Sequence, residues 1–306
     1  MSSAIVFAYH NVGVRCLSAL LDRGVNISLV LTHEDNPQEN IWFDSVAELA
    51  RIHRIPVITP DNPNTPEIIA QIAALQPDFL FSFYYRSMLA TEVLQIPRQG
   101  AFNMHGSLLP KYRGRVPVNW AIIKGETETG ATLHQMVEKP DAGGIVDQQA
   151  ISILENDTAL DVFNKVTVAA EMVLHRALPA LIDGTALLKP QNLSQGSYFG
   201  GRKPEDGIID WHNSAENIHN LVRAVAPPYP GAWTTVAGQK LRFLRTLREK
   251  QRDAEKSRPR LYLKNDNIFA CCGDGGVLRI IALELDGDRL SPQAFQQLFG
   301  LSVELV

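Results

Sequence analysis

Short apolar runs alternate with amphipathic stretches through the first third of the chain. Four of the apolar runs predict buried strands, at residues 4–8, 27–32, 56–59 and 79–83. Three amphipathic stretches predict helices between them, at residues 12–23, 44–53 and 66–75, the last with Thr65 as its N-cap. Repeated β-α-β units fold with right-handed crossovers into a parallel sheet. The pattern therefore predicts an α/β fold with a Rossmann-like, doubly wound, mostly parallel sheet.

The pattern changes after Pro190. The longest amphipathic stretch, residues 158–182, predicts a helix that Gly184 ends, and residues 194–207 are rich in turn formers. A further helix is predicted at residues 215–225. Short strands are predicted after it, at residues 232–236, 241–246, 260–263, 268–271 and 277–283. Such strands favour a small β-barrel, so we expect two domains, residues 1–203 and 204–306.

Composition and net charge limit the kinds of partner and the cellular location that we expect for this protein. With 306 residues and 45% hydrophobic content it can bury a sizeable core, and a net charge of -4 creates no global attraction to nucleic acid or membranes. The amino terminus lacks a basic region, and no apolar run is long enough to span a bilayer. We expect a cytoplasmic protein without a membrane or nucleic-acid partner, and the sequence leaves a homo-oligomer open.

Cysteine and histidine usage predicts neither disulfides nor a metal site. Cys16, Cys271 and Cys272 are too few for a disulfide framework and lack zinc-ligand spacing, so we expect buried thiols. The eight histidines are scattered and form no His-Glu-X-X-His motif, so we predict no catalytic metal.

Three polar side chains have chemistry that suits acyl transfer: Asn103, His105 and Asp141. In the extended segment Phe-Asn-Met-His, residues 102–105, alternation directs Asn103 and His105 to one face and the apolar residues to the core. An Asn amide can donate a hydrogen bond to an oxyanion, and a His can exchange a proton near neutral pH. An Asp can orient the imidazole and raise its pKa. Turn formers follow at residues 106–114, where α/β sheets place their ligands, so we predict that the three residues are catalytic.

Simpler interpretations of these residues remain open. An Asn-X-His pair at a strand end is commonly a satisfied hydrogen-bonding pair, and Asp147 is a rival partner for His105. His10 follows the first predicted strand and is interpreted as a hydrogen-bonded loop histidine, not a catalytic one. Residues 11–13 lack the full G-x-G-x-x-G pattern, so dinucleotide binding is weakly supported.

A family resemblance is carried by two segments. Residues 102–114, Phe-Asn-Met-His-Gly-Ser-Leu-Leu-Pro-Lys-Tyr-Arg-Gly, with Asp-Ala-Gly at 141–143, resemble the signature of the N10-formyltetrahydrofolate-dependent formyltransferases. The resemblance covers nearly the whole chain. It is closest to the branch that acts on UDP-4-amino-4-deoxy-L-arabinose (UDP-L-Ara4N) in lipid A and lipopolysaccharide modification, which is linked to antibiotic resistance. Stretches outside the signature also match, at residues 6–10, 81–86, 125–130, 132–134, 198–200, 204–207 and 220–225.

The resemblance implies a reaction, a site and an OB-like carboxy-terminal barrel. A formyl group would pass from N10-formyltetrahydrofolate, a donor cosubstrate used without metal, to the 4-amine of a nucleotide-linked amino sugar. Asn103, His105 and Asp141 would be catalytic. The residues implied to contact the donor are Ser87, Met88, Leu89, Arg115, Val137, Glu138, Lys139, Pro140 and Asp141.

Two rival functions share the three catalytic residues. A methionyl-tRNA formyltransferase would be expected to carry a basic loop near its active site, yet residues 33–40 are acidic and contain no Lys or Arg. The basic stretch at residues 240–260 is interpreted as a solvated loop surface, because Glu249, Asp253 and Glu255 interleave with its cations. A formyltetrahydrofolate hydrolase would need only water beside the same three residues, so they do not exclude it.

Overall fold

Two compact units make up the chain, and the computed structural model describes residues 2–253 and 258–305. Each unit is discontinuous in sequence. The first comprises Met1–Pro117, Glu128–Ile151 and Asn164–Gly200, and the second comprises Val118–Thr127, Ser152–Phe163 and Gly201–Val306.

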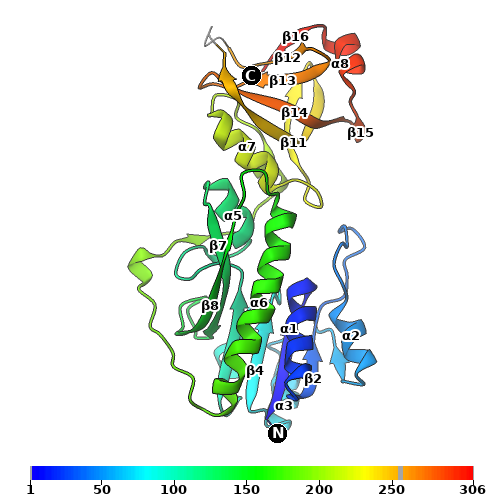
Figure 1. Ribbon diagram of the computed structural model, residues 1–306. Coiled ribbons are helices and arrows are strands. Elements are labelled where there is room, and N and C mark those ends of the chain that lie inside the picture. Colours follow the sequence, from blue (N-terminus) through cyan, green and yellow to red (C-terminus); the bar gives the residue numbers. More distant parts are fainter. Residues whose placement is uncertain (1, 254–257, 306) are drawn as a thin grey trace. The chain divides into compact units, whose positions relative to one another are not determined.

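The first unit is built on a seven-stranded sheet with the order β3-β2-β1-β4-β5-β7-β8 (Figure 1). Its strands are β1 (Ser3–Ala8), β2 (Asn26–Leu31), β3 (Val57–Ile58), β4 (Phe79–Phe83), β5 (Gly100–His105), β7 (Glu128–Gln135) and β8 (Ile145–Ser152). The pairings among β1 to β5 are parallel, whereas β5 and β7 are antiparallel. The predicted mostly parallel sheet is confirmed, and each of the four strands predicted in the first third of the chain is present.

Helices connect the parallel strands as the amphipathic pattern predicts. The connections from β1 to β5 are α1 (His10–Asp22), α2 (Val46–Ile52), α3 (Pro66–Ala74) and α4 (Thr91–Leu94), and the long α6 (Ala159–Ile182) follows β8. Thr65 caps α3 as predicted, because its hydroxyl accepts the Ile68 N-H at 3.4 Å. α1 and α6 lie side by side (Figure 1), and Arg15 pairs with Glu171 across them at 2.7 Å. The pattern did not predict α4, which is a single turn long.

Burial explains why β1 reads as an unbroken apolar run. Strands of a parallel sheet are covered on both faces, so the side chains that point to either face must be apolar. Ile5 and Phe7 on one face are fully buried in a cluster with Leu29, Leu80 and other residues of the neighbouring strands, and Val6 on the opposite face is fully buried as well.

The second unit contains an antiparallel, curled half-barrel sheet with the strand order β10-β11-β14-β13-β12-β16, which agrees with the expected barrel-like domain. The strands are β10 (Ala232–Val236), β11 (Gln239–Arg252), β12 (Arg260–Lys264), β13 (Asn267–Cys271), β14 (Gly276–Leu285), β15 (Asp288–Arg289) and β16 (Ser302–Glu304). The helices of this unit are α5 (Pro117–Ile123), α7 (Ala215–Ala224) and α8 (Pro292–Phe299). Trp211 is fully buried at the centre of its core, in edge-to-face contact with Phe243.

The strand predicted at residues 241–246 is present but extends to residue 252, so the loop interpretation of the basic stretch is wrong for residues 247–252. Residues 240–252 belong to β11, which pairs with β14. The charged residues alternate with buried Leu241, Phe243 and Thr246, because one face of the strand covers the core and the other is solvated. Glu255, one of the acidic residues used in that prediction, lies outside the described residues.

All three cysteines are free and buried, which confirms the predicted thiols. In the described part of the chain, no helix combines the length and the apolarity needed to cross a membrane.

Candidate active site

Three parallel strands end side by side where the order of the sheet reverses. Ala8 of β1 is paired with Phe83 of β4, and Phe83 is paired with Met104 of β5. The chain runs outward from β1 through β2 to β3 and then returns to β4 on the other side of β1. Ligands of open α/β sheets bind outside the carboxyl ends of strands at such a reversal. His105, the last residue of β5, therefore lies at this edge.

Alternation along β5 separates chemistry from core as predicted. Phe102 and Met104 are buried, and Asn103 is only partly buried. His105 is also buried, with 6% of its surface exposed, because the loop after β5 folds back over it.

Both ring nitrogens of His105 face oxygen atoms. Nε2 lies 2.8 Å from the carbonyl oxygen of Tyr112, and Nδ1 lies 3.6 Å from Oδ1 of Asp141. A carbonyl only accepts hydrogen bonds, so Nε2 carries a proton that it donates to Tyr112. When the ring is neutral, its free lone pair is therefore on Nδ1, beside the Asp141 carboxylate.

Asp141 is held in a strained conformation by contacts from three directions. Its φ of 53° is in the left-handed region, which non-glycine residues rarely adopt. Oδ2 accepts the Gly114 N-H at 2.8 Å, and Oδ1 lies 3.5 Å from Nε2 of His134. Burial alone would raise the pKa of Asp141, but the positive charges that His105 and His134 carry when protonated, together with the hydrogen bond from the Gly114 N-H, lower it, and they prevail. Asp141 is therefore ionised at neutral pH.

The pKa of His105 is lowered from its ordinary value. Burial is the largest cause, and the nearby His134 adds to it, while Asp141 and the Tyr112 carbonyl oppose the shift. Asp141 therefore acts in the predicted direction, but desolvation outweighs it. The ring is neutral at neutral pH and can accept a proton.

His134 is a member of this cluster that the sequence did not single out. It is 2% exposed and faces Asn103 across the β5-β7 pairing. Its Nδ1-H donates to the Gln135 carbonyl at 2.9 Å, so in the neutral ring Nε2 accepts the Asn103 Nδ2-H at 3.1 Å. His134 thus orients the Asn103 amide. Alternation within residues 132–137 could have placed His134 on a defined face, but its opposition to Asn103 depends on strand register.

A short parallel pairing fixes the loop that covers His105. β6 (Arg113–Gly114) pairs with β9 (Tyr198–Phe199). Gly114 has a φ of 98°, and a Cβ there would lie 2.2 Å from the Phe199 carbonyl oxygen, so glycine is required for this approach. The Tyr112 ring stacks on Phe199 at 5.4 Å. The Tyr112 carbonyl and the Gly114 N-H therefore lie in one loop, the clamped loop of residues 112–114, which the β6-β9 pairing holds in place.

The residues implied to contact a formyl donor lie in segments that follow β4, β6 and β7. They are Ser87, Met88, Leu89, Arg115, Val137, Glu138, Lys139, Pro140 and Asp141. Leu89 is buried in the same apolar cluster that Met136 packs against. By contrast, Met88 is 63% and Val137 is 40% exposed. The first segment and the residue before the third are thus anchored in one apolar cluster, and each segment presents an apolar side chain to solvent.

The alternative roles considered for Asp147 and His10 are resolved by their contacts. Asp147 binds Arg176 at 2.6 Å, and its position leaves Asp141 as the carboxylate beside His105. His10 is the first residue of α1, so the predicted loop position is wrong, and its ring stacks on Phe43 with ring centroids 4.0 Å apart. Burial, helped by Arg86, lowers the pKa of His10 to about 3, so the ring is neutral over the physiological range.

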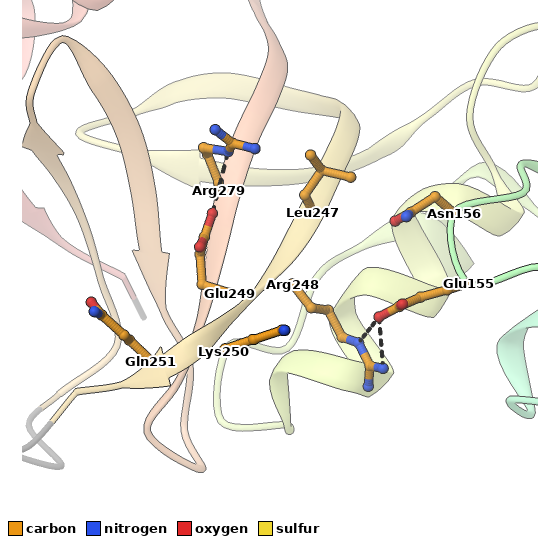
Figure 2. A pocket seen from close by; sticks show the side chains of 8 residues that line it. All are labelled: Glu155, Asn156, Leu247, Arg248, Glu249, Lys250, Gln251 and Arg279. Carbon is orange, nitrogen blue, oxygen red and sulfur yellow. Dashed lines mark hydrogen bonds and ion pairs between the residues drawn. The ribbon is translucent and has the colours of Figure 1, made fainter.

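A polar pocket of about 530 Å³ lies within the second unit (Figure 2). Its lining residues are Glu155, Asn156, Leu247, Arg248, Glu249, Lys250, Gln251 and Arg279. Figure 2 shows Arg248 directed at Glu155 and Arg279 directed at Glu249, and these pairs are 2.9 and 3.3 Å apart. Its charges largely neutralise one another, and it contains none of the groups of the His105 cluster. Among residues 2–253 and 258–305, no group of three His, Cys, Asp or Glu side chains is placed to hold a metal ion.

The chain matches two family models and shares its fold with several solved structures. Residues 5–178 match Formyl transferase, and residues 202–299 match Formyl transferase, C-terminal domain. An N-formyltransferase from Helicobacter canadensis, in complex with folinic acid and dTDP-3-aminofucose, is 22% identical with a TM-score of 0.71, over 92% of this chain and 99% of that chain. WlaRD, a sugar 3N-formyl transferase in the presence of dTDP and 5-N-formyl-THF, is 19% identical with a TM-score of 0.69, over 94% and 99%.

HypX from Aquifex aeolicus, in complex with tetrahydrofolic acid, has a TM-score of 0.64 at 18% identity, over 96% of this chain and 46% of that chain. At these identities the three structures establish the fold. The first family model alone spans more than half of the sequence and the second spans most of the rest, so the chain belongs to the formyl transferase family.

Proposed function

We propose that this protein transfers the formyl group of N10-formyltetrahydrofolate to the amine of a nucleotide-linked amino sugar, with the 4-amine of UDP-4-amino-4-deoxy-L-arabinose as the preferred acceptor. The observation that carries the proposal is the convergence of Asn103, His105 and Asp141 at the edge where the sheet reverses. These groups supply a hydrogen-bond donor, a neutral base and a fixed negative charge.

Asn103 and His105 act at different atoms. One N-H of the Asn103 amide is engaged by His134, so the second is available to stabilise the oxyanion formed when the amine adds to the formyl carbon. His105 accepts the proton that the amine loses and returns it to N10 as the bond from carbon to N10 breaks. While His105 is charged, the proton on Nδ1 is stabilised by Asp141 at 3.6 Å. The net result is one carbon-nitrogen bond exchanged for another.

The segments around the site suit a folate donor. A pterin is flat and partly apolar, and binding sites for such ligands combine apolar walls with a few polar groups. The exposed side chains of Met88 and Val137 provide apolar surface, while Leu89 anchors its segment in the core. Arg115 and Lys139, both exposed, supply positive charge to an anionic donor.

A nucleotide-sugar acceptor is supported by the fold and by the sequence. The N-formyltransferase from H. canadensis was solved with dTDP-3-aminofucose, and WlaRD is a sugar 3N-formyl transferase. The choice of a UDP-linked 4-amino sugar rests on the resemblance of stretches outside the signature, such as residues 198–200 and 220–225.

A tRNA acceptor is disfavoured by the charges near the site and on β11. Glu39 of the acidic loop forms a bidentate pair with Arg86, which neutralises a cation in the segment after β4. On β11, Arg242 pairs with Glu284 at 3.0 Å and Arg248 pairs with Glu155 at 2.9 Å. Cations already paired with carboxylates bind RNA phosphates weakly.

Turnover with defined acceptors tests the proposal. The purified chain is incubated with N10-formyltetrahydrofolate and UDP-4-amino-4-deoxy-L-arabinose, a dTDP-linked 4-amino sugar or initiator methionyl-tRNA. Tetrahydrofolate release and the mass of the acceptor are then followed. We expect N-formylation of the amino sugars, fastest for the UDP-linked one, and none of the tRNA. His105→Ala serves as the inactive control.

A reaction without acceptor separates transfer from hydrolysis. Release of tetrahydrofolate at the same rate with and without amino sugar would identify a hydrolase and overturn the proposal. Faster formylation of methionyl-tRNA than of any amino sugar would overturn the assigned acceptor.

A further inference from the structure

Arg113 is a buried cation whose side chain has no partner among residues 2–253 and 258–305. It is 8% exposed, and its Nε is sealed from solvent without a hydrogen-bond acceptor. In the described part of the chain, no carboxylate pairs with it. Charged groups are rarely buried unless they are paired, because their desolvation is costly.

Arg223 shows how this chain satisfies an equally buried arginine. Arg223 is 7% exposed, donates to Oδ1 of Asn220 at 2.9 Å and donates to the carbonyls of Leu154 at 3.2 Å and Asp157 at 3.0 Å. Arg113 has no comparable set of acceptors. Among the described residues the Arg113 side chain therefore lacks the acceptors that satisfy Arg223, which leaves it able to bind an anionic ligand.

The backbone of Arg113 is fixed between the two loops of the catalytic cluster. The carbonyl of the preceding residue, Tyr112, accepts a hydrogen bond from His105. The N-H of the following residue, Gly114, donates a hydrogen bond to Asp141. The Arg113 N-H itself is bound to the Ser197 carbonyl at 3.0 Å. Backbone movement that would expose the guanidinium would therefore break contacts of the proposed site, so the buried cation is part of its construction.

We propose that Arg113 binds the diphosphate of the nucleotide-linked acceptor. The inference rests on the proposed function and deepens it. An arginine fork binds two oxygens of a phosphate or carboxylate at once, and its charge is most effective where water is excluded. Two anions could reach the site, the diphosphate of the acceptor and the glutamate carboxylates of the folate donor. The segments assigned to the donor already contain Arg115 and Lys139, whereas the acceptor has no other assigned cation, which favours the diphosphate.

Binding measured without turnover tests this assignment. Arg113→Met keeps a long side chain without charge, Arg113→Lys keeps the charge without the fork, and Arg51→Met removes an exposed cation on α2 as a matched control. Isothermal titration with UDP, dTDP and folinic acid gives dissociation constants for each variant. The melting temperature of each ligand-free variant is measured in parallel.

We expect Arg113→Met to weaken UDP or dTDP binding about tenfold to a hundredfold, Arg113→Lys to weaken it less, and folinic acid binding to be unchanged. The ligand-free melting temperature of Arg113→Met should be equal to or above that of the wild type, because an unpaired buried charge is removed. Arg51→Met should match the wild type throughout.

Three outcomes would overturn the assignment. Unchanged nucleotide binding in both Arg113 variants would exclude an anion-binding role. Loss of folinic acid binding alone would assign the cation to the donor's carboxylate. A purely structural role would give a different pattern. The melting temperature of Arg113→Met would fall strongly, while Arg113→Lys would keep its nucleotide affinity, and added pyrophosphate would not change that affinity.

Failure of the proposed function is distinguishable from these outcomes. If no amino sugar is formylated but nucleotide binding still depends on Arg113, the binding site stands and the reaction is wrong. If amino sugars are formylated and nucleotide affinity does not depend on Arg113, the reaction stands and the assignment of Arg113 is wrong.

Discussion

Replacing Asp141 by Asn tests the electrostatic core of the proposed mechanism. The substitution keeps the shape of the side chain but removes a charge 3.6 Å from Nδ1 of His105. With an effective dielectric constant of about 20, opposite unit charges at this separation attract by about 4.6 kcal/mol. Since each 1.36 kcal/mol is about tenfold in rate, losing most of this stabilisation lowers kcat by about a hundredfold to a thousandfold. KM for the formyl donor should change little.

The pH profile of the same variant gives a second, independent readout. His105 must be neutral to accept a proton, so kcat/KM falls as the pH drops through the pKa of His105. Burial is the largest cause of the lowered pKa, and Asp141 opposes it. Without the Asp141 charge the pKa falls further, so the acid limb of the Asp141→Asn profile should move to lower pH.

Steady-state rates at saturating amino sugar and varied concentrations of the formyl donor, collected across the pH range, supply kcat and kcat/KM. Asp147→Asn is the matched control, because Asp147 binds Arg176 at 2.6 Å instead of His105, and it should retain wild-type turnover. Near-normal kcat in Asp141→Asn, or an acid limb displaced to higher pH, would refute the assigned role of Asp141.

Three further predictions concern the groups that support the site. His134→Leu should lower kcat about tenfold or more, because His134 acts through the Asn103 amide. For the same reason, the double variant His134→Leu/Asn103→Ala should lose little more activity than Asn103→Ala alone. Additive losses in a double-mutant cycle would contradict this. Gly114→Ala should lower the free energy of unfolding by more than the roughly 1 kcal/mol expected for Gly184→Ala. Both positions have positive φ, but only Gly114 has a carbonyl oxygen 2.2 Å from the added Cβ. Urea unfolding compares the two, and equal losses would show that the approach at Gly114 is relaxed without cost. The pKa of Asp141 is lowered in the fold, so its stabilising effect is present above its ordinary value of 3.8 and is lost as the pH falls through the folded value. The difference in unfolding free energy between wild type and Asp141→Asn should therefore be constant above about pH 5 and shrink as the pH is lowered from about 5 to about 2, and a constant difference over this lower range would contradict the ionised state.

Local pattern was sufficient for much of the fold. The strands and helices of the first third follow from periodicity and from the Thr65 cap, because these depend on neighbours within a few residues. The loop interpretation of residues 247–252, beyond the correctly predicted strand at 241–246, failed for the same reason. The dense charges of this stretch resemble a solvated loop, and only pairing with β14 makes it part of the strand β11.

The sequence by itself determined the chemical groups and the face on which two of them lie. Alternation along residues 102–105 places Asn103 and His105 together, since the side-chain period of a strand is two and needs no distant contact. The tertiary structure decided the rest. It set His134 opposite Asn103 through the register of β5 and β7, brought Asp141 to His105, and left Arg113 buried in the clamped loop without a partner among the described residues. Strand register and loop closure bring together residues that are far apart in the chain, and desolvation acts on a residue only once its neighbours cover it. These effects therefore arise only when the strands pair and water is excluded.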